Sequence, residues 1–458
     1  MKNSEKINID KEYDVIVIGG GTTGVCAAIA AARSGANTAL IEIQGFLGGN
    51  ACNGMAWYGF HSTGSYQQVV AGIPLEIIER LREIDGASEF CPDPVAGSMV
   101  QVNTTLLKLV CAELCQENGV DLHLHCMLTD VLECGKERQV IAVQSKINRY
   151  CFASKVLIDC TDSGDAAVAA GAKYIQGREQ DGKMQVASST LFISGINMSE
   201  LMAYFDEHPD QLRPIPVPEE ELRSLVKRMH NVPVFGMGAF PDLIAKAKQE
   251  GLTDYPRDRL VGQAFVRTGE MMLVASRVED ADPNNESAYT RGELTGTLQM
   301  KATLKLLREY IPGCQNARIS GSGHTLGLRE TRHVIGDYYL TGNDLLEGKE
   351  FYDCVARGAY HLDVHSPDHQ GIETGHPPVY QIPYRSMLPR DVNGLLIAGR
   401  CYSQDQTAQA STRVIPIAGA AGQACGTAAG LAVKNNCAPR DIDISVLRDT
   451  LIKDGAYI

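Results

Sequence analysis

The sequence predicts an α/β fold in which a domain with a parallel central sheet and a β-meander carries an inserted α+β domain. Short β-branched apolar runs that lead into glycine-rich turns and small-residue helices predict the first domain. A change of composition between about residues 190 and 320 predicts the insertion. The chain has 458 residues, about three times a typical domain length, so more than one structural unit is expected.

The first predicted element is a strand at 13–18, YDVIVI, whose β-branched apolar run is typical of a buried parallel strand. A glycine-rich turn follows, and then a helix of small residues that ends at Gly35. A second strand of similar composition closes at Glu42. These elements form one complete βαβ unit of about 30 residues, the length expected for a Rossmann-like unit.

The turn of this unit has the G-x-G-x-x-G spacing of a dinucleotide-binding site. Gly19 permits the tight turn, Gly21 lets the backbone approach a pyrophosphate, and Gly24 lets the helix pack closely on the strand. The helix N-terminus offers N–H groups and a positive dipole end to phosphates. Glu42, 18 residues after Gly24, suits a ribose diol and repels a 2′-phosphate. The context favours a binding site over a turn without a ligand; its candidate contacts are Gly19, Gly21, Thr22, Thr23, Gly24 and Glu42.

Further along the chain, apolar spacing predicts helices over 68–85 and 103–118. The segments DLHLHCMLTDVLECG and QVIAVQSKI alternate apolar and polar residues, which predicts an antiparallel meander. Residues 155–162 form another buried strand, which runs into a Gly/Asp turn and a small-residue helix. These elements complete the first part of the predicted sheet domain.

The middle of the chain differs in character, with four prolines between 209 and 218 followed by an acidic run. Two amphipathic helices are predicted there, near 219–230 and 241–250. The small-residue style then returns with a strand at 394–400 and an Ala/Gly helix at 416–433. The predicted division is a first part of the binding domain, an inserted substrate or cap domain, and a return part, at 1–190, 191–325 and 326–458.

Charge and composition exclude several classes of function. The net charge of −13 disfavours nucleic acid and anionic membranes as partners. No apolar run approaches the length of a membrane span, and the N-terminus is polar, so a cytoplasmic protein is expected. None of the 14 cysteines forms a CxxC pair. Cys111 and Cys115 are one helical turn apart among apolar residues, which favours core packing over a metal site, and no metal is expected.

Three features favour FAD over NAD as the dinucleotide: the N-terminal position of the fingerprint, the cluster GFLGGNACNG at 45–54, and the small-residue strand and helix near the end of the chain. These residues resemble the FAD-dependent oxidoreductases of the glutathione-reductase-like superfamily, which has two dinucleotide folds, and more narrowly a bacterial branch of it. The resemblance covers the middle of the chain poorly and rests on the stretches 47–49, 326–345, 382–401 and 411–430.

The resemblance implies a role for each matching residue. The fingerprint and Glu42 would hold the ADP half of FAD, and 411–422 would pass the flavin ring, with the helix from near Pro416 pointing its N-terminus at the pyrimidine end. The remaining implied contacts are Gly48, Gly49 and Asn50 near the pyrophosphate, Asp159, Thr161, Gly164 and Asp165 as a second short motif, Gly399 and Arg400 at the ribityl chain, and Gly422.

Two departures from the superfamily narrow this expectation. Arg400 stands where the superfamily often has an aspartate. No second G-x-G-x-x-G and no redox cysteine pair is present, so neither an NAD(P)H domain nor a disulfide reductase is expected. Electrons would therefore pass to or from a separate donor or acceptor.

The candidate catalytic residues are His61, His324, Arg329, Arg332 and Arg413. Arg329 and Arg332 would share a face if helical, and two guanidinium groups suit a carboxylate. The same arginines, with Glu330, also fit a salt-bridged knot between domains. His61 is alternatively an exposed turn residue or a covalent flavin attachment point. His361 and His365 have metal-like spacing, but Pro367 and nearby glycines favour a loop there.

The sequence thus predicts an enzyme that transfers a hydride between FAD and a small organic substrate, for which the arginines suit an anion. Proteins of the resembled type are often homodimers. Two alternatives remain open: a flavoprotein with a non-redox role, such as isomerisation or RNA modification, and a binding module that kept the fold and lost the flavin.

Overall fold

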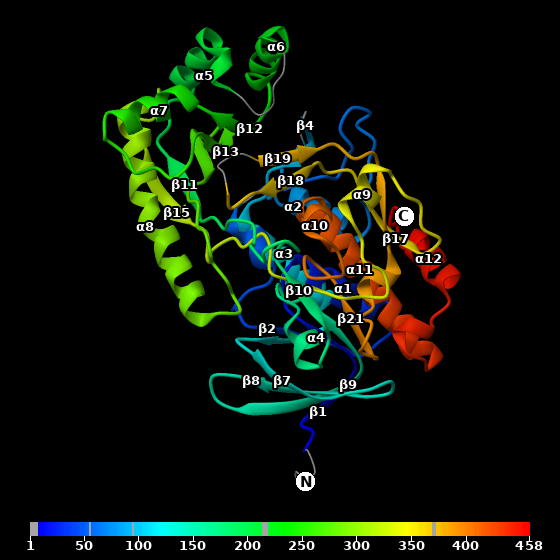
Figure 1. Cartoon of the computed structure of the whole chain (residues 1–458). Coiled ribbons are helices and arrows are strands. Elements are labelled where there is room, and N and C mark those ends of the chain that lie inside the picture. Colours follow the sequence, from blue (N-terminus) through cyan, green and yellow to red (C-terminus); the bar gives the residue numbers. More distant parts are fainter. Residues whose placement is uncertain (1–7, 55, 94–95, 213–218, 369–371) are drawn as a thin grey trace.

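The computed structural model describes residues 8–54, 56–93, 96–212, 219–368 and 372–458. Part of the proline-rich stretch predicted to open the middle region, 213–218, lies outside the described residues. The fold is α/β, with a mixed central sheet and a second, antiparallel sheet that lies beside it (Figure 1).

The central sheet has parallel strands in its middle. β1 (Lys11–Ile18) lies between β2 (Thr38–Glu42) and β9 (Arg149–Asp159), and Ile18 lies opposite both Ile41 and Asp159. The sheet continues from β2 to parallel β6 (Asp121–Leu124), and β21 (Leu395–Ile397) pairs with the end of β9. The carboxyl ends of these strands therefore meet at one edge, where ligands bind in open parallel sheets.

The predicted meander is present but begins later than expected. β7 (Met127–Cys134) and β8 (Gln139–Gln144) pair antiparallel and join the first half of β9. The segment DLHL, predicted as part of the meander, is instead the parallel edge strand β6. His125, which has a positive φ of 54°, separates β6 from β7 and lets the chain change direction.

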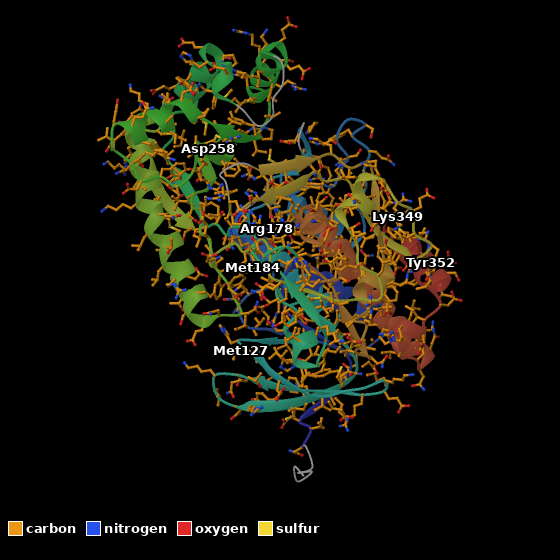
Figure 2. All side chains as sticks on the ribbon, in the orientation of Figure 1. Met127, Arg178, Met184, Asp258, Lys349 and Tyr352 are labelled. Carbon is orange, nitrogen blue, oxygen red and sulfur yellow. The ribbon has the colours of Figure 1, made fainter. Side chains whose placement is uncertain are left out.

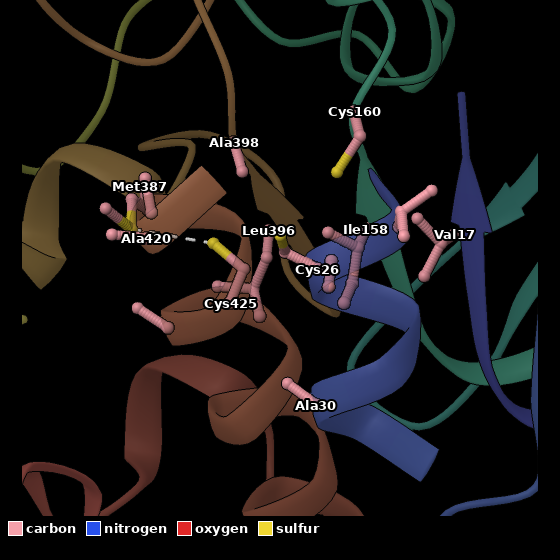
Figure 3. Close-up of a cluster of buried hydrophobic side chains, with 14 of the residues drawn as sticks. Val17, Cys26, Ala30, Ile158, Cys160, Met387, Leu396, Ala398, Ala420 and Cys425 are labelled. Carbon is pink, nitrogen blue, oxygen red and sulfur yellow. Dashed lines mark hydrogen bonds between the residues drawn. The ribbon is translucent and has the colours of Figure 1, made fainter. Parts of the chain in front are cut away.

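Helix α11 (Ile415–Asn435) folds back onto α1 (Thr22–Arg33) through glycines one turn apart. An added Cβ at Gly422 would overlap the Thr23 carbonyl oxygen, and one at Gly426 would overlap that of Ala27. Figure 3 shows the sealed core around this contact, where Cys26, Ile158, Leu396 and Cys425 meet. The return of the chain onto its first unit, expected from the small-residue helix, is confirmed.

The other side of α1 carries α2 (Ile73–Glu83) and α3 (Thr104–Glu117), close to the two predicted helices. α2 begins five residues later than predicted, because Gly72 has a φ of 71° and Pro74 opens the first turn. Cys111 and Cys115 on α3 are fully buried in the apolar core, so core packing is confirmed for this pair. A small sheet of β3, β4 and β5 lies next to it, at Trp57–Tyr58, Cys91–Asp93 and Gly97–Val100.

The second sheet has the order β12-β13-β14-β11-β15 and is antiparallel throughout. Its helices surround a separate apolar core that includes Phe205, Phe240 and Leu306. Both predicted amphipathic helices are present, as α6 (Glu219–Met229) and α7 (Pro241–Gln249). The strands are β11 (Thr190–Ser194), β12 (Val234–Ala239), β13 (Leu260–Phe265), β14 (Glu270–Val274) and β15 (Arg318–Ser322), and the other long helices are α5 (Met198–Glu207) and α8 (Glu286–Tyr310).

The return segment builds several short elements before α11. β18 (Leu362–His365) pairs with β19 (Ile372–Gly375), so the predicted loop around His361 and His365 is wrong. The apolar–polar alternation of LDVH outweighs the nearby proline as a signal. The remaining elements are β10 (Tyr174–Gln176), β16 (Arg332–Val334), α4 (Asp165–Ala169), α9 (Gly342–Leu346), β17 (Cys354–Gly358), β20 (Tyr380–Pro383), α10 (Gln406–Thr412) and α12 (Ile444–Lys453).

Across the described ranges, no single helix has both the length and the apolar composition needed to cross a bilayer. Helices α10 and α11 meet those criteria only when taken together, and they are bent by 95° relative to each other.

Candidate functional site

The fingerprint turn leaves open space at one glycine and none at the other two. An added Cβ at Gly19, whose φ is 97°, would lie 2.5 Å from the Cys160 carbonyl oxygen, and one at Gly24 would overlap the Gly19 carbonyl. At Gly21 an added Cβ would meet no protein atom within 4 Å. The turn therefore packs tightly against the sheet on one side and is open to a ligand at Gly21.

The N-terminus of α1 opens onto this space. Its N-cap is Gly21, no side chain of the described residues caps it, and the first intrahelical bond runs from Val25 N to the Gly21 carbonyl. Gly48 N donates to the Gly20 carbonyl at 2.8 Å, and Gly49, with a φ of 52°, lies directly against Gly21. Two glycine-rich backbones and uncapped N–H groups thus form a cradle that fits a pyrophosphate.

Glu42 lies at the end of β2 beside this cradle. Its Oε2 accepts from Gly20 N at 2.5 Å and its Oε1 from Gln44 N at 2.6 Å. A carboxylate has about four acceptor positions, so two remain for a ribose diol. Burial raises the pKa of this carboxyl, although the backbone donors oppose the shift. The fit to an adenine-side ribose is consistent with the spacing seen in the sequence.

The second short motif shapes a turn. Asp159 has no exposed surface, and its oxygens accept from Thr161 N (3.0 Å), Thr161 Oγ1 (2.7 Å) and Ala167 N (2.8 Å). Thr161 Oγ1 in turn accepts from Asp165 N at 2.8 Å. Gly164 adopts a φ of 67° with no room for a side chain beside Val334. Asp159 therefore holds the turn at the strand end and cannot itself offer an oxygen to a ligand.

Two arginines of the return segment form hydrogen bonds and ion pairs with this turn. Arg332 Nε donates to the Ser163 carbonyl at 2.7 Å, and its guanidinium pairs with Asp165. Arg400 pairs with Asp162 at 2.5 Å and donates to the Leu328 carbonyl at 2.6 Å. For Arg332 the salt-bridged interpretation fits these contacts. Arg400 stands where the resembled superfamily often has an aspartate, and its ion pair with Asp162 accounts for an arginine at this position.

Arg329 and Arg332 do not share a helical face. No helix includes Arg329, and β16 begins at Arg332. Glu330, between them, is buried and accepts from Gln185 N and Gln406 Nε2 and bonds His333. The two arginines thus serve different sites.

Gly399 and Gly422 lie on either side of Thr23 near the start of α1. Gly399 has a φ of 96°, which L side chains rarely adopt, and an added Cβ there would lie 3.8 Å from the Thr23 side chain. Gly422 packs on the Thr23 carbonyl oxygen. Gly422 therefore brings α11 onto α1, and its predicted place among the cofactor contacts is explained by helix packing.

The N-terminus of α11 opens at the junction of the two sheets. Its N-cap is Val414, no side chain of the described residues caps it, and Pro416 occupies the first turn. Arg413, just before it, donates from Nη2 to the Asp363 carbonyl (2.9 Å) and to Asp363 Oδ2 (3.0 Å). The Arg413 Nε is buried without a partner among the described residues. This end of the helix thus places a cation and a positive dipole end together.

Arg329 lies near Arg413 and contacts a second arginine through a serine. Its Nη1 donates to the Val186 carbonyl (2.6 Å) and to Ser188 Oγ (2.9 Å). Arg257, just before β13, donates from Nη2 to the same Ser188 oxygen at 2.7 Å. Figure 2 labels Asp258, the residue after Arg257, on the second-sheet side of the molecule. Sequence reasoning missed Arg257 and Ser188, which belong to no recognisable motif.

Asp363 and His365 on β18 lie beside these arginines. Although burial opposes it, His365 and Arg413 hold the pKa of Asp363 well below its usual range. Burial and the neighbouring Arg329 lower the pKa of His365 to about 3, so this imidazole is neutral at pH 7. His365 bonds Asp363 at 3.2 Å. The described residues hold no group of three or more His, Cys, Asp or Glu side chains arranged for a metal ion.

The two other predicted histidines lie elsewhere. His61 is only 9% exposed, bonds Ser98 Oγ at 3.0 Å through Nδ1, and stacks on Tyr66. The interpretation of His61 as an exposed turn residue is therefore wrong. His324 bonds Lys108 Nζ at 2.9 Å and packs on Phe46, near the glycine cluster. No contact within the described ranges joins either histidine to the arginines at the junction.

The segment after Gly49 ties the cradle to the second sheet. Asn53 Nδ2 donates to Asn50 Oδ1 at 2.6 Å and to the Thr325 carbonyl at 3.2 Å. Thr190 Oγ1, at the start of β11, donates to the Asn53 carbonyl at 2.5 Å. Asn50 therefore lies between the cradle and the start of β11, and its predicted contact with FAD stays a prediction.

The fold resembles known flavoenzyme structures at low sequence identity. The p-nitrophenol 4-monooxygenase of Pseudomonas putida is 10% identical with a TM-score of 0.49, covering 97% of this chain and 84% of its own. A geranylgeranyl bacteriochlorophyll reductase-like protein of Thermoplasma acidophilum is 12% identical with a TM-score of 0.47, covering 98% and 84%. A flavin-dependent brominase is 13% identical with a TM-score of 0.46, covering 96% and 83%. No curated protein sequence matches this chain.

A family model described as FAD dependent oxidoreductase matches residues 14–451, which is nearly the whole chain. The cradle, the uncapped helix and Glu42 fit the dinucleotide that this family binds. The chain therefore belongs to the FAD-dependent oxidoreductase family and is a flavoenzyme with FAD as its cofactor.

Proposed function

We propose that this oxidoreductase transfers a hydride between FAD and a small organic anion at the junction of the two sheets. When bound, FAD supplies the ring nitrogen that accepts or gives the hydride. The observation that carries the proposal is the pair of buried arginines, Arg329 and Arg257, near the half-buried Arg413, which precedes the N-terminus of α11. An anionic substrate held there would lie next to the helix that the resemblance places at the flavin.

The chain's own residues prepare this site in three ways. The positive end of α11 and Arg413 favour negative charge at the junction. Tyr360, His361 and His365 nearby are buried, which lowers the local dielectric and strengthens the electrostatic interactions. Tyr58 is buried enough to raise its pKa, and its oxygen accepts from Gln263 Nε2 at 2.7 Å. Its hydroxyl proton is thus retained at pH 7 and can serve as a hydrogen-bond donor.

The test is anaerobic reduction of the purified FAD-loaded protein by small organic acids, followed by reoxidation with soluble electron acceptors. The Arg329→Ala variant should raise KM by about tenfold or more while FAD stays at full occupancy, because a buried guanidinium binds the substrate and does not contact the cradle. Loss of FAD from this variant contradicts the role. Failure of every donor to bleach the flavin favours the non-redox alternative, isomerisation or RNA modification, and a protein that binds no flavin favours the binding module.

Several broader expectations belong to the same proposal. A separate electron donor or acceptor would complete the reaction, since the sequence contains no second dinucleotide fingerprint. Residues 191–325 would be the substrate or cap domain, because the second sheet supplies Arg257 and has its own core. We also propose kinship with the glutathione-reductase-like superfamily, a cytoplasmic location and a homodimer, for which the sequence features described above are the support.

A further inference from the structure

Arg257 and Arg329 reach one serine hydroxyl from opposite sides of the junction. Arg257 Nη2 and Arg329 Nη1 donate to Ser188 Oγ at 2.7 and 2.9 Å. Arg257 precedes the second-sheet strand β13, whereas Arg329 belongs to the return segment. Both residues are buried, with 7% and 9% of their surfaces exposed. Ser188 therefore fixes the distance between two guanidinium groups that come from different parts of the fold.

Neither of these two arginines contacts a carboxylate in the described part of the chain. Their neighbours differ in this respect, because Arg277 pairs with Glu279 at 3.4 Å and Arg413 with Asp363 at 3.0 Å. The acceptors of Arg257 and Arg329 are all neutral: Ser188 Oγ and the carbonyl oxygens of Ser276 and Val186. Among the described residues, neither buried guanidinium therefore has a contacting carboxylate, and the charge of Asp363 acts on both only without direct contact.

Such an arrangement is unfavourable without an anion. Removing a charge from water costs several kcal/mol, and two like charges that share one neutral acceptor repel each other. A guanidinium has five N–H donors, and Arg257 and Arg329 each use only part of theirs. None of their remaining guanidinium nitrogens is fully buried without a hydrogen-bond partner in the described residues. These donors therefore keep some accessible surface. An incoming anion would find both the charge and the donors already positioned.

We propose that Arg257 and Arg329 together bind the carboxylate of an organic acid substrate, with Ser188 setting their separation. This inference rests on the proposed hydride transfer and narrows its substrate class. A carboxylate fits because guanidinium forks match its planar geometry. It also fits the reaction, because hydride transfer needs a C–H bond on the bound molecule, and inorganic oxyanions have none.

The experiment measures binding to the FAD-loaded protein by calorimetry and by thermal shift, with propionate as the probe and propionamide as its uncharged counterpart. Propionate should bind about tenfold or more tightly than propionamide and raise Tm with concentration. Arg257→Met and Arg329→Met should each weaken propionate binding by about tenfold or more, with FAD content unchanged. The matched control is Arg259→Met, because Arg259 lies two residues from Arg257 but pairs with Asp258 at the surface.

The lysine variants Arg257→Lys and Arg329→Lys separate charge from geometry. They should retain part of the affinity, because the charge remains and the fork is lost. Equal binding of propionate by wild type and both methionine variants would overturn the inference, as would equal binding of propionamide or of sulfate. If propionate binding follows the two arginines but no organic acid reduces the flavin, the proposed hydride transfer fails and the carboxylate site stands.

Discussion

Two glycines of the fingerprint turn, three positions apart, are required for different reasons. At Gly24 the protein leaves no room, because a Cβ would overlap the Gly19 carbonyl oxygen. At Gly21 the protein leaves room that only a ligand would use, and its φ of −63° is ordinary for any residue. One glycine therefore serves the fold and the other serves the cofactor.

This difference predicts opposite effects of the same substitution. Gly21→Ala should fold with the Tm of the FAD-free wild type but weaken FAD binding by about tenfold or more, since the methyl group enters the phosphate cradle. Gly24→Ala should lower the Tm of the FAD-free protein, because overpacking costs about 1–3 kcal/mol. Thermal unfolding without FAD and fluorescence titration with FAD measure the two effects. An FAD affinity of Gly21→Ala equal to that of the wild type would contradict the cradle.

At the residue scale, the sequence located the groups whose partners are near in the chain. Gly19, Gly24 and Glu42 belong to one short motif whose spacing reflects its geometry. Arg257 and Ser188 could not be found in this way, because their contact spans 69 positions and that of Arg329 with Ser188 spans 141. A buried arginine without a carboxylate has no local signature, so only the fold reveals it.

Helices α1 and α11 pack so closely that glycines of α11 at the contact have no room for a Cβ. Gly422, Gly426 and Gly430 recur every four residues, and each brings α11 against α1 or the serine at its end. Glycine weakens an isolated helix by about 1 kcal/mol relative to alanine. The close approach must therefore offset that cost, as it does by sealing the apolar core between the helices.

The same helix supplies a matched pair of variants. Gly426→Ala should reduce the free energy of unfolding by about 1–3 kcal/mol, because its methyl group would overlap the rigid Ala27 carbonyl. Gly419→Ala should cost less than Gly426→Ala, because its nearest neighbours are the side chains of Pro74 and Cys26 at 3.0 and 3.4 Å, which need to move by only a few tenths of an ångström, and alanine favours the helix. Denaturant unfolding of both variants measures this difference. Equal losses in the two would show that helix packing is not the cause.

At the element scale, strong periodicity predicted the strands and helices of the first βαβ unit, α3, α6, α7 and α11. The strand β6 was assigned to the meander because alternation does not reveal whether a strand pairs parallel or antiparallel. The long helix α8 was missed, since its polar and apolar residues give only a weak stripe and many of its side chains are exposed. Whether a strand such as β6 pairs parallel or antiparallel is decided by its neighbouring strands rather than by its own residues.

For the whole molecule, histidines with lowered pKa values link stability to pH. Partial or full desolvation lowers the pKa of His61, His123, His324, His361 and His365, the last to about 3. Each of these histidines binds protons more readily in the unfolded chain, so stability rises with pH until the unfolded pKa of about 6.5 is passed. Asp165, whose pKa burial raises to about 6, acts in the opposite sense below that pH.

We therefore expect Tm to fall as the pH is lowered from 7.5 to 6. In this window the histidines of the unfolded chain take up protons while His365 in the folded protein stays neutral, and Asp165 opposes the fall only near pH 6, where its own pKa lies. His365→Gln should show a smaller fall, because glutamine has no proton to bind. Scanning calorimetry of both proteins at pH 7.5, 6.75 and 6 tests this, and identical pH dependence in the two would contradict it.

The overall architecture could be predicted from the sequence, whereas the contacts between the two sheets could not. The FAD cofactor and the α/β fold follow from the two ends of the chain, where the motifs lie. The domain division and the catalytic residues remain predictions. Contacts between the sheets, such as Asn53 with Thr190 and Thr325, form between segments that carry no shared pattern in the sequence.

The pairing of β21 with β9 and of α11 with α1 has a consequence for biosynthesis. Synthesis runs from the N-terminus, and the cradle at residues 19–49 leaves the ribosome long before residues 395–435 exist. Until then the end of β9 lacks its second parallel neighbour, β21, and the small-residue face of α1 is uncovered. We therefore expect this apolar face to stay exposed until late in translation, when residues 395–435 can pack on it.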